Sequence, residues 1–266
     1  MQFFQLWFCA NCALFLLSCV QSEQIYAQKK RIHNAKESLS LSGFDSLLQT
    51  CAKGKAFDMQ SCDTNLVHSA IKEFAQELSK AKNDKLAMLC SYGNLYHAWL
   101  LIALSRKPHL VHIGNCPDFL CKDTLILQKD TINLASIKAR ILSMAESLSL
   151  PVWFSLWNGT VSGANPPRKS WKKNSIVKTL QASAKAYFAH KEQEYSLDIT
   201  MNILRISSQY ILDRLGSLEC SKEQSLSILK SVTNYLPESM AAYIALHKNQ
   251  IIVKPIMVSD RISVAW

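Results

Sequence analysis

The sequence predicts a mainly α-helical protein of about seven to eight helices, with a small β-hairpin near residues 152–161 and a C-terminal edge strand. Glycine is scarce: the chain has only 7 glycines in 266 residues, whereas average usage is about 7%. Hydrophobic residues make up 48% of the chain and charged residues 19%, which is typical of a globular protein. Apolar residues recur three and four positions apart over long stretches, as they do on helices that bury one face. These three observations favour long helices over a fold with many turns.

The N-terminal segment of residues 3–19 is apolar and uncharged, and a polar, charged stretch follows it directly. It is short for a membrane-spanning helix, which needs about 20 apolar residues. The pattern predicts a signal peptide over residues 1–22 and therefore an exported protein. Cleavage before Glu23 would release a soluble chain, whereas Leu16-Leu17-Ser18-Cys19 resembles a bacterial lipobox and would leave a lipid on Cys19. An uncleaved anchor and no export at all are the remaining alternatives.

The N-terminal half of the chain, residues 23–150, is expected to consist of helices. The stretch 63–82 has apolar side chains on one face, whereas 86–104 is apolar almost all round and is expected at the centre of a core. Polar residues within 86–104 argue against a membrane span there. The expected helices cover residues 26–40, 44–53, 63–82, 86–104 and 124–148.

Residues 151–173 differ in composition from both neighbours and form a candidate boundary between two helical halves. The β-rich run Val152–Trp157, followed by Asn158-Gly159, predicts a hairpin with a tight turn. An exposed basic loop over residues 166–173 is expected to follow the hairpin.

The C-terminal half, residues 174–266, is expected to hold four helices and a strand. Apolar residues from Leu197 to Leu215 alternate spacings of four and three, which predicts a helix with a packed seam. Ser221 and Gln224 have the spacing of a capping box, and Pro255 restricts the last strand to a sheet edge. The elements are expected at residues 175–194, 197–215, from 221 onward, 237–248 and 251–258.

Six cysteines follow the signal segment, and an even number in an exported chain predicts disulfides. Short loops close with little loss of entropy, so the pairs that lie close in sequence are the natural ones and the other two cysteines would pair with each other. The pairs would be Cys51–Cys62, Cys116–Cys121 and Cys90–Cys220. Other connectivities stay open, and buried free thiols are the alternative.

Two further patterns have a chemical and a structural interpretation. His109, His112, Cys116 and Cys121 are donors that zinc accepts, but in an oxidising compartment the cysteines would pair instead, so neither a metal nor another cofactor is expected. Asn158 begins an N-glycosylation sequon, and the alternative is that Asn-Gly serves the backbone of the turn.

The charge of the chain predicts anionic partners. The 30 Lys and Arg residues exceed the 20 Asp and Glu residues, for a net charge of +10. Export makes nucleic acid an unexpected partner, which leaves a protein, an anionic membrane or a cell-wall surface. An aromatic ring among cations suits a lipid headgroup or a glycan, although an ordinary solvated loop has the same composition. The candidate contacts are Arg168, Lys169, Trp171, Lys172 and Lys173.

The sequence contains no nucleophile elbow, metalloprotease motif or nucleotide-binding glycine loop. Cys90 and His97 lie about 10 Å apart along one expected helix, so we interpret both as core residues. The leading hypothesis is an exported, membrane-tethered, non-enzymatic envelope or cell-surface protein that binds or scaffolds a partner. The alternatives are an exported glycan or cell-wall hydrolase with carboxylate catalysis, and a secreted helical ligand or effector.

Overall fold

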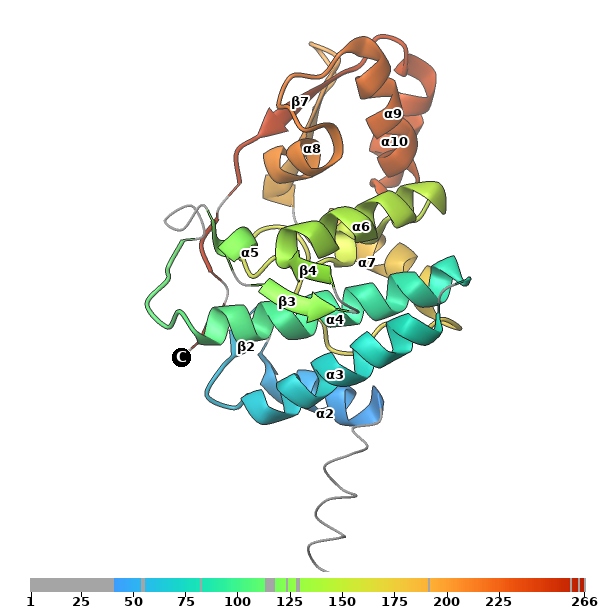
Figure 1. The fold of residues 1–266 in the computed structure, drawn as a ribbon. Coiled ribbons are helices and arrows are strands. Elements are labelled where there is room, and N and C mark those ends of the chain that lie inside the picture. Colours follow the sequence, from blue (N-terminus) through green and yellow to red (C-terminus); the bar gives the residue numbers. More distant parts are fainter. Residues whose placement is uncertain are drawn as a thin grey trace, which may run out of the picture. The chain divides into compact units, whose positions relative to one another are not determined.

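Helices form most of the computed structural model (Figure 1), which confirms the predicted fold class. The structure describes residues 41–266 except residues 54, 55, 82, 113–117, 123, 128, 129, 191, 259, 263 and 266. The predicted signal segment 1–22, with Cys19, and the expected helix 26–40 lie outside these described residues. Residues 41–266 form one compact unit.

The first part of this unit is built around α4 (Lys85–Ser105), which packs against α3 (Thr64–Lys80). Asp63 and Asp84 begin these two helices, because each carboxylate accepts backbone N–H groups of the first turn. Every residue from 89 to 104 is buried, which confirms the predicted core helix. Among the described residues α4 is also the one helix long and apolar enough to cross a membrane, and 83% of its apolar window is buried inside the protein.

Short elements surround this helix pair. The first helix, α2 (Leu41–Cys51), packs on α3. Two short strands, β1 (Ala52–Lys53) and β2 (Ala56–Asp58), pair antiparallel, and β8 (Val264–Ala265) pairs parallel to β2. A strand near the C-terminus therefore lies beside a strand near the start of the described residues.

Residues 124–127 and 130–133 form paired strands, so the helix predicted over 124–148 is wrong before residue 134. Strand β3 (Thr124–Leu127) pairs antiparallel with β4 (Asp130–Asn133), and α5 (Phe119–Lys122) precedes them. Helix α6 (Leu134–Ser147) begins only at Asn133, which forms a capping box with Ser136. The helical spacing of apolar residues that motivated the prediction lies C-terminal to this cap.

The hairpin predicted near 152–161 is absent. Residues Val152–Ser155 form a 3₁₀ helix, η2, and all residues from 152 to 157 are buried. A fully buried apolar run has no alternation of faces, so its spacing does not separate a strand from a helical turn. Thr160 instead pairs antiparallel with Ile262 near the C-terminus.

A three-stranded sheet replaces the first half of the helix predicted over 197–215. Strand β5 (Tyr195–Asp198) pairs antiparallel with β6 (Ile203–Ser207), and β7 (Ile252–Ile256) pairs parallel to β6. Leu197 and Leu204 lie directly opposite each other, so a separation of seven residues places them on one face of the sheet, as it would on a helix. Strand β7 is at the edge and contains Pro255, which confirms the predicted edge strand.

The remaining helices pack around this sheet. Helix α9 begins with the predicted capping box of Ser221 and Gln224. The elements are α7 (Ile176–His190), η3 (Glu192–Glu194), α8 (Ser208–Leu215), α9 (Lys222–Val232), η4 (Thr233–Tyr235) and α10 (Glu238–His247).

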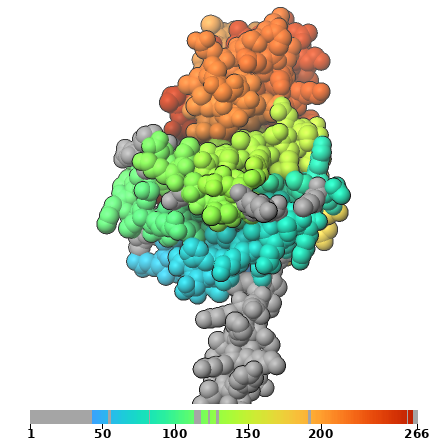
Figure 2. All heavy atoms as spheres, viewed as in Figure 1, coloured from blue at the N-terminus to red at the C-terminus, as the bar shows by residue number. Residues whose placement is uncertain are grey.

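Buried side chains form two hydrophobic clusters. The first contains the core of α3, α4 and α6, together with Trp171 and the start of α7. The second contains the inner face of the β5–β6–β7 sheet with α8 and α9. Figure 2 shows the region around α8 and α9, in orange, packed directly on α6, in yellow-green. Because Trp171 is in the first cluster, residues 166–173 pack with that cluster, although in sequence they lie between the two predicted halves.

Candidate functional site

The loop of residues 166–173, here called the basic loop, is held to α2 and α4 by polar contacts. Asp45 accepts a hydrogen bond of 2.5 Å from the Ser170 N–H and forms an ion pair of 2.9 Å with Lys172. Burial raises the pKa of Asp45, but the hydrogen bonds from Ser170 and Lys172 outweigh burial, so its pKa lies below the usual value. Lys173 forms an ion pair of 2.5 Å with Asp84. Two of the predicted contact lysines are therefore engaged within the protein.

Trp171 is buried, contrary to the expectation of an aromatic ring exposed among cations. Only 4% of the residue is exposed, and its ring packs edge-on against His97 with centroids 5.5 Å apart. A Cβ atom at Gly93 would lie 2.1 Å from a carbon of this ring, so only glycine permits the contact. The Trp171 backbone is held by the side chain of Asn94 through two hydrogen bonds. Trp171 therefore anchors the basic loop to α4.

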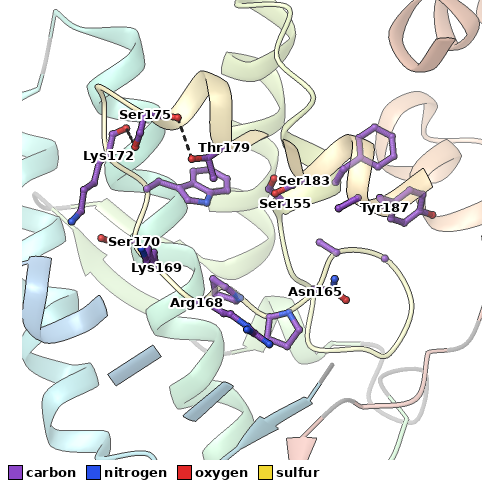
Figure 3. Close-up of a pocket in the computed structure, with 17 residues that line it drawn as sticks. Ser155, Asn165, Arg168, Lys169, Ser170, Lys172, Ser175, Thr179, Ser183 and Tyr187 are labelled. Atoms are coloured by element: carbon purple, nitrogen blue, oxygen red, sulfur yellow. Dashed lines mark hydrogen bonds between the residues drawn. The ribbon is translucent and has the colours of Figure 1, made fainter. Parts of the chain in front are cut away.

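The other two predicted contacts, Arg168 and Lys169, stand exposed at a cavity of about 500 Å³. Neither forms an ion pair with any part of the chain that the structure describes. Figure 3 places Arg168 and Asn165 on one side of this cavity and the α7 residues Thr179 and Ser183 on the other. The polar lining residues are Ser155, Asn165, Arg168, Lys169, Ser170, Lys172, Ser175, Thr179, Ser183 and Tyr187.

A buried carboxylate supports the wall of the cavity. Glu194 is 4% exposed and accepts hydrogen bonds from the Gly163 N–H and from the Tyr187 hydroxyl, at 2.9 Å each to Oε2. Burial and the neighbouring Glu194 raise the pKa of Tyr187, so its hydroxyl stays protonated and donates to the carboxylate. Gly163 and Tyr187 both line the cavity, so Glu194 fixes two parts of its wall.

A second cavity of about 640 Å³ brings together Glu146 and Asp213, the kind of acid pair that the hydrolase hypothesis requires. Asp213, however, is fully engaged. Its Oδ1 accepts from Gln209, while its Oδ2 accepts from Trp153 and pairs with Lys138 at 2.6 Å. These three partners come from α6, η2 and α8 and hold the Asp213 carboxylate within a network that joins the three elements. We therefore assign Asp213 to the architecture.

Five of the six cysteines predicted to form disulfides are free thiols in the structure. The sixth, Cys116, lies outside the described residues. Burial raises the pKa of both Cys51 and Cys62, and the Cys51 thiol donates to the Ser61 carbonyl at 3.4 Å. Burial raises the pKa of Cys90 to about 12. Cys90 belongs to the first hydrophobic cluster, whereas Cys220 packs against the second. Disulfide formation in an oxidising compartment stays a prediction.

The weak zinc candidates do not form a site within the described residues. Cys116 lies outside them, Cys121 is exposed, and His112 Nδ1 pairs with Asp260 at 2.7 Å. No group of three or more His, Cys, Asp or Glu side chains in this part of the chain could hold a metal ion.

The sequon at Asn158 is folded into the protein and does not stand on an exposed turn. The Asn158 Oδ1 accepts hydrogen bonds from the Thr160 N–H at 3.1 Å and from the Thr160 hydroxyl at 2.7 Å. Thr160 is 4% exposed, and Gly159 has a left-handed φ of +85° and packs near Leu104. The structural interpretation of Asn-Gly, as a dipeptide chosen for its backbone, fits this arrangement.

His97 is a core residue, and its burial predicts a loss of stability in acid. Burial lowers the pKa of His97 to about 3, and its Nε2 has no hydrogen-bond partner among the described residues. In the unfolded chain the pKa is about 6.5, so below that pH the unfolded state binds more protons than the folded state. We expect His97 to remove about 1.4 kcal/mol of unfolding free energy for each pH unit between about pH 6 and its folded-state pKa of about 3.

The measurement is urea unfolding of the wild type and of His97→Phe between pH 7 and pH 4. Phenylalanine preserves an aromatic ring against Trp171 but does not titrate. The variant should show the shallower pH dependence, whatever uniform change in stability it brings. Parallel pH profiles of the two proteins would contradict the prediction.

The sequence pointed to Arg168 and Lys169 but missed the hydroxyls that face them across the cavity. Ser175, directly before α7, and Thr179 and Ser183 within it recur every four residues, a pattern that was readable as one face of a helix. Ser155 carried no such signal, because η2 was expected as a strand. No protein-family model, curated protein or solved structure matches the chain. The site is therefore defined by its own geometry.

Proposed function

We propose that the protein is an exported, membrane-tethered, non-enzymatic binding protein that holds an anionic carbohydrate polymer of the cell envelope at the basic loop. The observation that carries this proposal is the pair Arg168 and Lys169, which are exposed at a cavity and have no ion-pair partner among the described residues. The neighbouring Lys172 and Lys173 have intramolecular partners. Within the basic loop, Arg168 and Lys169 are therefore the cations that the described residues leave available to an external anion.

The shape of the site favours a polymer of sugars over a lipid surface. A flat bilayer cannot follow a concave cavity, whereas a chain of sugars can place one residue inside it. Membrane-surface binding also relies on aromatic side chains at the interface, and the only aromatic residue of the basic loop is buried. The net charge of +10 would draw an anionic polymer toward the protein over a longer range.

The test is binding of the natively expressed protein to dextran sulfate, with neutral dextran as the reference. Protein purified from membranes in a neutral detergent is used, and its intact mass fixes whether the chain begins at Cys19, at Glu23 or at Met1. Replacing both cations, in R168Q/K169Q, should weaken binding about tenfold, because two exposed charge contacts are together worth about 1.4 kcal/mol.

The matched control is K178Q/K185Q, which removes the same charge from exposed positions of α7 that do not line the cavity. Equal losses in the two double variants would mean that net charge alone attracts the polymer, and the proposal would fail. Binding to vesicles of anionic lipid without binding to dextran sulfate would identify the membrane as the partner and would also overturn it.

A further inference from the structure

A row of hydroxyl groups follows one face of α7 inside the cavity at the basic loop. Ser175 directly precedes α7, and Thr179 and Ser183 follow it at steps of four residues, so the three lie one above the other at intervals of about 6 Å. The Ser175 hydroxyl donates to the Lys172 carbonyl and the Thr179 hydroxyl to the Ser175 carbonyl, which leaves their oxygens as acceptors. The Ser183 hydroxyl has no hydrogen bond within the described residues and can donate or accept.

A buried hydroxyl completes this polar surface. Ser155 is 9% exposed, lines the same cavity, and its Oγ has no hydrogen-bond partner in the described part of the chain. An unsatisfied buried hydroxyl is destabilising, so a group that enters the cavity and bonds to it would remove that cost. Figure 3 shows Ser155 at the cavity together with Ser183.

The remaining wall is a mixture of apolar and cationic groups. Phe154, Pro166 and Pro167 line the cavity with carbon atoms, while Arg168 and Lys169 supply the cations. Hydroxyls that both donate and accept match the hydroxyls of a polyol, and guanidinium and ammonium groups match a phosphate, sulfate or carboxylate. The volume of about 500 Å³ lies within the usual range for small-molecule sites, about 300–1,000 Å³.

We infer that the cavity binds one sugar unit that carries an anionic group. The anion lies on Arg168 and Lys169, and the sugar hydroxyls bond to Ser155 and Ser183. This inference rests on the proposed function and specifies the unit of the polymer that the site recognises. The cavity should therefore bind an anionic sugar more tightly than a bare anion, because a bare anion leaves the Ser155 hydroxyl without a partner.

The test is calorimetric titration of the full-length protein in neutral detergent with five probes. Glucose 6-phosphate, glucose 6-sulfate and glucuronate each carry an anionic group on a sugar. The two reference compounds are inorganic phosphate, which is an anion without a sugar, and glucose, which is a sugar without an anion. At least one anionic sugar should bind about tenfold or more tightly than both of these references. The order among the three anionic sugars identifies which anion the site prefers.

Single serine variants test which hydroxyls recognise the sugar. Ser183→Ala and Ser155→Ala should each weaken binding of the preferred anionic sugar about tenfold. Both should fold, since alanine is the best helix former and the Ser155 hydroxyl has no partner to lose. Ser147→Ala, at an exposed position outside both cavities, is the matched control.

The outcomes separate this inference from the proposed function. Inorganic phosphate that binds as tightly as the anionic sugars, serine variants without effect, or no anionic sugar bound at all would each overturn the inference. Binding of dextran sulfate that still depends on Arg168 and Lys169 would then leave the proposed function standing. Loss of that dependence would remove the proposed function itself.

Discussion

Replacing Asp213 by alanine should lower the free energy of unfolding by about 3–5 kcal/mol, as expected when one partner of a buried ion pair is removed. The side chains of Lys138 and Asp213 are 11% and 13% exposed, and their charged atoms lie 2.6 Å apart. Without the carboxylate, the Lys138 ammonium would be left inside the protein with no opposite charge at this position. Urea unfolding followed by circular dichroism measures the loss.

The effect should be large because Asp213 connects three elements. Lys138 comes from α6, Trp153 from η2, and Gln209 and Asp213 from α8. The indole N–H of Trp153 donates to the same carboxylate at 2.8 Å and would also lose its acceptor. The network therefore joins the helices of the first hydrophobic cluster to those of the second.

Two controls make this prediction specific. Glu146→Ala removes the other acid of the second cavity, which is 73% exposed and 3.9 Å from Arg214, and should change stability by less than about 1 kcal/mol. In a double-mutant cycle, Lys138→Met combined with Asp213→Leu should destabilise less than the sum of the two single changes. Additive effects would show that the two charges do not depend on each other.

Local signals in the sequence predicted the helices well where a cap and an apolar period agree. Asp63 and Asp84 begin α3 and α4, and both helices have the buried faces that their apolar residues indicated. The β5–β6 hairpin was missed for a physical reason. Leu197 and Leu204 lie opposite each other in the sheet, and the Asp198 carboxylate accepts two backbone N–H groups after β5. Two apolar residues seven apart can share a face either across such a hairpin or along a helix, so the spacing does not distinguish the two.

The candidate site was only partly readable for a different reason. Charge and composition identified Arg168 and Lys169, because an exposed cation needs no partner from elsewhere in the chain. The burial of Trp171 depends on Gly93 and Asn94, which lie about 77 residues earlier and leave no local pattern in the loop. Contacts between residues so far apart in sequence depend on how α4 packs in the folded protein, so they cannot be predicted from the residues of the loop.

Replacing Asn94 by alanine should destabilise the protein by about 2–5 kcal/mol and should also disrupt the basic loop. Asn94 Oδ1 accepts from the Trp171 N–H at 2.6 Å, and its Nδ2 donates to the Trp171 carbonyl at 3.0 Å. Asn94 is 2% exposed, so both backbone groups of Trp171 would lose their partners in a buried position. Each such group costs about 1–3 kcal/mol when it is left unsatisfied.

The matched control for this variant is Asn174→Ala, which makes the same substitution at an exposed position just after the basic loop and should change stability by less than about 0.5 kcal/mol. Urea unfolding measures stability, and hydrogen exchange of the Trp171 amide reports the anchor itself. Faster exchange at Trp171 with weaker binding of dextran sulfate would mean that the Asn94 contact positions Arg168 and Lys169. If Asn94→Ala unfolded at the same urea concentration as the wild type, the two hydrogen bonds would not hold the loop. The site would then have to be positioned by Asp45 and Asp84 through their ion pairs with Lys172 and Lys173.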